Sequence, residues 1–166
     1  MKKNQISYLA LLALAALFLV GCWGPDTLYL AGEGEALVKV PDLGEGHMVQ
    51  RFIYNGRDLN FEYSLEGQGE IVQVKYQLFL ATRNATSLKV SVSVVQAGNM
   101  LPLGSDVLEI TGNEGKKFEG LIRGRNLKTA PGDILRFTLS NTGGNEAVIF
   151  LSPTKKETSF IQVRLH

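Results

Sequence analysis

The sequence predicts an all-β protein: a two-sheet antiparallel β-sandwich, immunoglobulin-like or jelly-roll, with eight to ten strands. Three observations predict this class. Apolar and polar residues alternate with a period of two after residue 36, turn-forming residues recur about every 8–12 positions, and no amphipathic helix is evident there. The first 35 residues differ in character and do not follow this pattern.

The clearest strands are expected at 59–65, 72–80 and 88–94, where every second residue is apolar. Successive side chains of a strand point to opposite faces, so this alternation buries one face and leaves the other in water. Shorter strands are expected at 107–110, 118–122, 134–139, 147–151 and 160–165. The inward-facing positions predict a core that includes Phe61, Tyr76, Leu78, Val92, Phe137 and Ile149.

Turn chemistry separates these strands. Asn55-Gly56 predicts a hairpin, because both residues tolerate the positive φ of a type I′ turn. Further breaks are expected at 66–69, 112–115, 130–133 and 142–145, which are rich in Gly, Asn and Asp.

Residues 1–21 have the layout of a secretory signal peptide. Lys2 and Lys3 precede an apolar run at 6–20, and small residues follow it. The run is shorter than the roughly 20 apolar residues that a membrane-spanning helix needs. Extension of the run through Trp23 keeps a membrane-spanning anchor as the alternative.

The run ends in Leu19-Val20-Gly21-Cys22, which resembles the lipobox of bacterial lipoproteins. The resemblance implies cleavage between Gly21 and Cys22, with a diacylglycerol on the sulfur and usually a further acyl chain, such as palmitate, on the new amino group. Cys22 is the only cysteine, so it has no disulfide partner within the chain. Trp23 stands where an Asp tends to retain such proteins in the inner membrane, so the outer membrane is implied for a Gram-negative cell.

The expected organisation is a signal peptide at 1–21, a lipidated Cys22 with a tether at 22–35, and a single sandwich domain at 36–166. Leu28, Tyr29 and Leu30 could instead form an edge strand. Without residues 1–21 the chain has 15 basic and 16 acidic side chains, and this balance does not predict nucleic-acid binding.

The stretch "VKVPDLGEG" at 38–46 looks like the first strand and turn of a lipoyl domain. That family carries its lipoyl group on a lysine at a hairpin tip roughly 40 residues further on. Lys75 and Lys89 are the lysines near that distance, and both lie in alternating segments. We therefore interpret 38–46 as a strand followed by a Gly-rich turn, and we expect no cofactor.

Candidate catalytic and metal-binding residues are few. The histidines are His47 and His166, and "PGDILRFTLSNTG" at 131–143 resembles the strand before a blue-copper site. Such a site needs two histidines and a cysteine thiolate, and Cys22 is assigned to the anchor, so we expect no metal. The acidic residues near the tether, which are Glu33, Glu35, Asp42 and Glu45, are interpreted as a solvated loop.

Tyr54 and Tyr63 lie on either side of the Asn55-Gly56 turn and are the candidate ligand-binding residues, as a small aromatic platform. The leading hypothesis is a lipid-anchored, non-catalytic envelope module that contacts other envelope proteins through a sheet edge or loops. The alternative is a surface module that binds glycans. An extracytoplasmic enzyme is the third hypothesis.

Replacing Cys22 with Ser removes the sulfur that would carry the lipid. We expect the variant to leave the membrane fraction as a soluble or uncleaved form, because the acyl chains supply the membrane affinity. Detergent partitioning of labelled cells measures this. A Ser variant that partitions like the original chain would identify the apolar run as a spanning helix.

Overall fold

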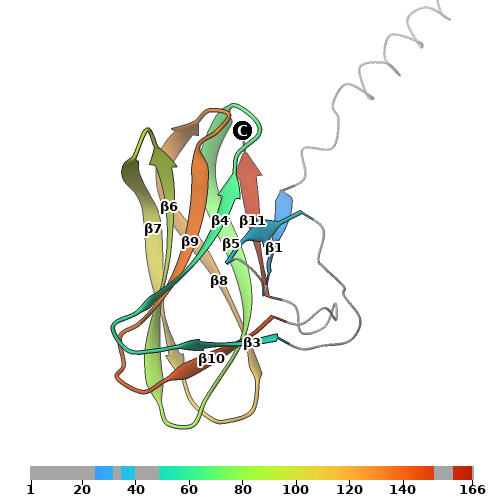
Figure 1. Ribbon diagram of the computed structural model, residues 1–166. Helices are drawn as coiled ribbons and strands as arrows, with labels where there is room; N and C mark the ends of the chain where they lie inside the picture. Colours follow the sequence, from blue (N-terminus) through green and yellow to red (C-terminus); the bar gives the residue numbers. More distant parts are fainter. Residues whose placement is uncertain (1–24, 32–34, 40–48, 152–158, 166) are drawn as a thin grey trace, which may run out of the picture.

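The computed structural model describes residues 25–31, 35–39, 49–151 and 159–165, which contain eleven strands (Figure 1). The strands are β1 (Asp26–Leu30), β2 (Leu37–Val38), β3 (Val49–Ile53), β4 (Asp58–Ser64), β5 (Gly69–Thr82), β6 (Thr86–Gln96), β7 (Asn99–Ile110), β8 (Lys116–Thr129), β9 (Ile134–Asn141), β10 (Ala147–Leu151) and β11 (Phe160–Leu165). Across these described ranges, no helix has the length and apolar character required to pass through a membrane.

The strands form two antiparallel sheets, which confirms the predicted fold class; the described residues contain eleven strands, where eight to ten were expected. Sheet A contains β3-β10-β5-β8. β11 also pairs with β5, β1 pairs with β11, and β2 pairs with β1, while sheet B has the order β4-β9-β6-β7. Along β3–β10 the chain passes between the sheets at almost every connection, as in a jelly roll. This strand order decides between the two sandwich types that the sequence left open.

The turns show which consecutive strands are paired. Ala97 and Gly98, with φ of 47° and 82°, form the tight hairpin between β6 and β7. The predicted hairpin at Asn55-Gly56 is wrong, because that turn carries the chain from β3 in sheet A to β4 in sheet B. Only Gly56 of the two central residues has a positive φ, and the Arg57 N–H donates to the Tyr54 carbonyl at 3.2 Å, as in a type II turn.

Strand β5 is the centre of sheet A. One edge of β5 pairs with β8. Along the other edge, β11 pairs with β5 as far as Gln77 of β5, and β10 pairs with β5 from Leu80 onward. The buried Ser159 bridges the gap between these two partners. Its hydroxyl accepts from the Phe79 N–H at 3.1 Å and donates to the Phe150 carbonyl at 3.0 Å. The side chain therefore satisfies backbone groups that the ladder leaves open.

The core lies between the two sheets and follows the period-two pattern. All six predicted core residues are at most 2% exposed, which confirms that prediction. Phe61 of β4 and Phe137 of β9 are the largest fully buried side chains. The Tyr76 ring lies 6.3 Å from that of Phe137 and links the two sheets.

The sandwich is closed on one side where β7 crosses β8. A Cβ atom on Gly124 would lie 1.5 Å from the Leu103 carbonyl oxygen, and one on Gly104 would lie 2.9 Å from the Arg123 carbonyl oxygen. Glycine at both positions therefore lets the two backbones touch. Leu103 itself is the extra residue of a bulge opposite β6 and is buried.

The same side is linked by a polar contact. The Tyr76 hydroxyl donates to the Asp106 carboxylate of β7 at 2.5 Å. Gly120 of β8 lies opposite Tyr76 in the ladder, and its lack of a side chain leaves room for the ring. Burial, followed by the hydrogen bond to Asp106, raises the pKa of Tyr76, so this hydroxyl remains a donor at neutral pH.

The described part of the domain begins earlier than the sequence predicted. Residues 26–30, expected within the tether, form β1, which pairs with β11 and β2. Leu28 and Leu30 are buried in the core. The segment is therefore a strand, as the alternative prediction held, but it lies between two partners and is not an edge strand.

Replacing Gly124 with Ala should lower the free energy of unfolding by about 3 kcal/mol, because the new methyl group meets backbone rather than a movable side chain. Gly67→Ala is the matched control, since nothing lies within 4 Å of a Cβ there and its φ is not positive. Denaturant unfolding of both variants measures the difference. Equal stability of the two would contradict the close crossing.

Candidate functional site

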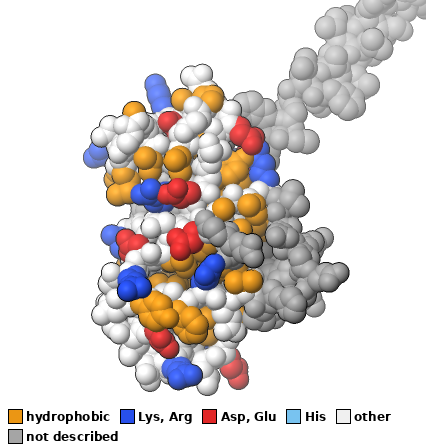
Figure 2. Space-filling view, viewed as in Figure 1, with side chains coloured by type: hydrophobic (Ala, Val, Ile, Leu, Met, Phe, Trp, Pro, Cys, Tyr) orange, Lys and Arg blue, Asp and Glu red, His pale blue; other side chains and the backbone are white. Residues whose placement is uncertain are grey.

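Exposed apolar side chains concentrate on one strand. Five large hydrophobic residues of the described chain are exposed, and three of them, Val49, Phe52 and Tyr54, lie on β3 or directly after it. Figure 2 shows one group of hydrophobic side chains in the lower part of the molecule, where Figure 1 places β3 and β10, with charged side chains around it, and further hydrophobic groups higher on the same face. This strand is therefore the candidate contact surface.

The fold explains why these residues are exposed. Among the described strands, β3 pairs only with β10, so it is an edge of sheet A. Ile53 points inward and is buried, so Phe52 and Tyr54 on either side of it must point outward. In the register with β10, Phe52 lies opposite Val148 and Gln50 lies opposite Phe150.

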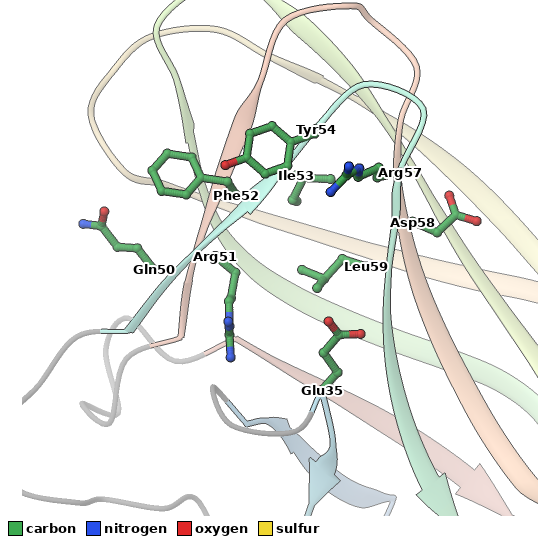
Figure 3. A pocket seen from close by; sticks show the side chains of 9 residues that line it. All are labelled: Glu35, Gln50, Arg51, Phe52, Ile53, Tyr54, Arg57, Asp58 and Leu59. Atoms are coloured by element: carbon green, nitrogen blue, oxygen red, sulfur yellow. The ribbon is translucent and has the colours of Figure 1, made fainter.

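Phe52 and Tyr54 form an aromatic pair, which we call the platform. Their ring centroids are 6.0 Å apart and their planes differ by 20°, so the two rings turn their faces the same way (Figure 3). They are 46% and 47% exposed. The other aromatic pairs on the outer face of sheet A, Tyr29–Phe160 and Phe79–Phe150, are half-buried, with planes 60° and 80° apart.

A concave pocket of about 400 Å³, the edge pocket, lies beside the platform. It is lined by Glu35, Gln50, Arg51, Phe52, Ile53, Tyr54, Arg57, Asp58 and Leu59. In Figure 3 the Arg57 side chain extends back toward Tyr54, and Asp58 points away from the rings. The Asp58 carboxylate accepts a hydrogen bond from the Ser140 hydroxyl at 2.6 Å, which fixes its position.

A second pocket of about 420 Å³, the face pocket, adjoins the edge pocket at Phe52. Gln50 and Phe52 line both pockets. The remaining lining of the face pocket combines apolar side chains of sheet A with polar groups from the adjoining loops, and consists of Ala81, Thr82, Arg83, Asn113, Glu146, Val148 and Phe150. Phe52 therefore borders two pockets of similar size.

Asn141, at the end of β9, holds β3 in place. It is 4% exposed, and its amide NH₂ donates to the Ile53 carbonyl at 2.9 Å. Its amide oxygen accepts from the Thr86 hydroxyl and the Gly143 N–H, both at 3.1 Å. These bonds tie the edge strand of sheet A to sheet B and to the loop before β10, so they orient the platform.

The predicted platform of Tyr54 and Tyr63 is not formed, since the two residues line different pockets. Tyr63 is half-buried, and its hydroxyl is buried with no hydrogen-bond partner among the described residues. The Lys39 ammonium lies 5.7 Å from the centre of the Tyr63 ring and bonds to Glu66 at 2.6 Å, the bond that chiefly raises the pKa of Lys39.

Phe52 was not among the residues predicted from the sequence. The signal was present in "RFIY" at 51–54, where Phe and Tyr stand two residues apart before a turn and therefore share a face of an extended strand.

The other predicted residues fall in two groups. Gly21, Cys22, His47 and His166 lie outside the described residues, as do Glu33, Asp42 and Glu45. Lys75 and Lys89 lie within β5 and β6, as expected. In the part of the chain that the structure covers, no three His, Cys, Asp or Glu residues are grouped closely enough to hold a metal ion.

No known protein-family model matches the chain, and no curated protein matches its sequence. Solved structures do match the fold. A CocE/NonD family hydrolase from Staphylococcus aureus aligns with a TM-score of 0.70 and 11% identity over 86% of this chain. An α-amino acid ester hydrolase aligns over 86% of this chain with a TM-score of 0.67 and 14% identity. An aminopeptidase from a marine sediment Thaumarchaeota archaeon aligns over 84% with a TM-score of 0.66 and 10% identity.

These similarities describe the fold alone. The aligned region covers 36% of each of the three enzyme chains, so this chain spans about a third of their length. Carbohydrate-binding modules align at TM-scores of 0.40–0.46, which are too low to support an inference about a ligand.

Asn141→Ala should lower the free energy of unfolding by about 3 kcal/mol, because it leaves the buried Ile53 carbonyl without its partner. It should also speed hydrogen exchange in β3 more than in the β6–β7 hairpin. Asn126→Ala, at an exposed position of β8, is the control. Unchanged exchange in β3 would contradict the positioning role of Asn141.

Proposed function

We propose that this chain is an exported bacterial lipoprotein whose sandwich is a non-catalytic binding module, with the platform and the two adjoining pockets as its contact site. One observation carries the proposal. The platform exposes two parallel aromatic faces on an edge strand, beside polar side chains that line concave pockets. Binding sites combine apolar faces with a few placed polar groups in this way.

The anchor in this proposal is Cys22, at the outer membrane of a Gram-negative cell. Its support is the match of residues 19–22 to the lipobox and the basic, apolar and small-residue order before it. β1 begins at Asp26, four residues after Cys22. Four residues span at most about 14 Å, so this end of the sandwich would stand close to the lipid surface.

The contact site lies toward the opposite end of the sandwich. Through β11, Asp26 is level with Val74 of β5, whereas through β10, Phe52 is level with Ala81. Seven residues of strand separate these two levels, about 23 Å along β5. Figure 1 agrees, with the start of β1 and the end of β11 above the level of β3. An anchor at Cys22 would therefore direct the platform away from its own membrane.

The test uses the full chain, purified in detergent, and an immobilised envelope fraction of the source cells. We expect the double variant Phe52→Ala/Tyr54→Ala to bind at least tenfold more weakly than the original chain. Met100→Ala/Val107→Ala is the matched control, because it removes two exposed apolar side chains from β7. A thermal unfolding midpoint confirms that each variant is folded.

Equal binding of the two double variants would refute the assignment of the site to the platform. Loss of binding in both would show that the effect is not specific to the platform and would also refute this assignment.

A further inference from the structure

We propose that the platform binds a neutral oligosaccharide chain that crosses β3, with one segment in the edge pocket and the next in the face pocket. This inference rests on the proposed function and names the ligand class of the same site. Three features support it: the geometry of the rings, the charge balance of the pockets, and the positions of the two pockets relative to β3.

The rings present the surface that a sugar ring needs. One face of a pyranose carries C–H groups, whose slight positive charge suits the negative face of an aromatic ring. Phe52 and Tyr54 offer two such faces, nearly parallel and side by side. The tilted and edge-on geometry of the other two pairs, Tyr29–Phe160 and Phe79–Phe150, does not provide this surface.

The pocket side chains match hydroxyl groups rather than a charged ligand. The edge pocket contains two arginines and two carboxylates, and the face pocket contains Arg83 and Glu146. Each lining therefore has no net charge, so neither pocket attracts a polyanion or a polycation. Sugar hydroxyls both donate and accept, and a lining with arginine, amide and carboxylate groups serves both roles.

The order of the pockets distinguishes an oligosaccharide from a peptide strand. A peptide added to the edge of sheet A would run along β3 and hydrogen-bond to its backbone. The two pockets instead share the Gln50 and Phe52 side chains. From these the edge pocket continues toward Arg57 and Leu59 beyond the edge of sheet A, and the face pocket continues toward Ala81 and Val148 within sheet A. A ligand that fills both pockets must cross β3 over Phe52.

Single variants of the full chain separate the two pockets. Arg57 lines only the edge pocket and Asn113 only the face pocket, whereas Phe52 lines both. On the envelope fraction we expect Arg57→Ala and Asn113→Ala each to weaken binding several-fold, and Phe52→Ala to weaken it at least thirtyfold. Met100→Ala should bind like the original chain. If one of the two pocket variants binds like the original chain, the crossing ligand is refuted.

The ligand class is decided by treating the same envelope fraction in two ways. Periodate cleaves the vicinal diols of sugars, and a broad protease removes proteins. We expect periodate to abolish Phe52-dependent binding and protease treatment to leave it intact. Binding should also persist in 0.5 M salt, which is about five times the ionic strength at which the Debye length is 10 Å.

Binding that protease removes and periodate spares would overturn the carbohydrate assignment and identify a protein partner, while the proposed contact site would stand. Binding that salt abolishes would identify a charged ligand and would also overturn the assignment. Binding that does not depend on Phe52 and Tyr54 would refute the proposed function as well.

Discussion

Sheet A depends on β5, because three strands pair with this one strand. β8 occupies one edge along almost its whole length, while β11 and β10 follow each other along the other edge. The ladder is interrupted between these two partners, and the buried Ser159 hydroxyl satisfies the open backbone groups there. The position of β10 on β5 in turn determines where β3 lies, since β3 pairs with β10 alone among the described strands.

This dependence links the core to the site. β3 contributes Ile53 to the core, and the Asn141 amide holds the Ile53 carbonyl from the other sheet. Because side chains alternate between the two faces of a strand, Phe52 and Tyr54 then point outward. The platform therefore follows from the buried Ile53 side chain, the buried Asn141 amide and the alternation of side chains along β3. Its exposure requires no strained backbone, because φ is positive at neither Phe52 nor Tyr54.

Most of the fold was predictable from the sequence, because one-sided burial leaves a period-two pattern. That pattern predicted β4, β5, β6 and the six core residues. It failed for the first half of β7, where Pro102, the Leu103 bulge and Gly104 interrupt the alternation. Turn chemistry also failed at Asn55-Gly56, since it shows that the chain turns but not which sheet the next strand joins. Ala97-Gly98, a weaker signal, is the true hairpin.

The site was only half predictable, because exposure on an edge strand is a property of topology. Tyr54 was identified and Phe52 was not, and Tyr63 turned out to be half-buried beside Lys39. Exposed apolar groups on a long, flat edge strand invite aggregation. β3 has five residues and carries Arg51 between Gln50 and Phe52, so it offers only a short edge. A ligand that crosses such a strand contacts the ring faces without adding a strand to the sheet. A short edge also gives a second copy of the protein little backbone to pair with, so the two exposed rings do not by themselves lead to edge-to-edge association.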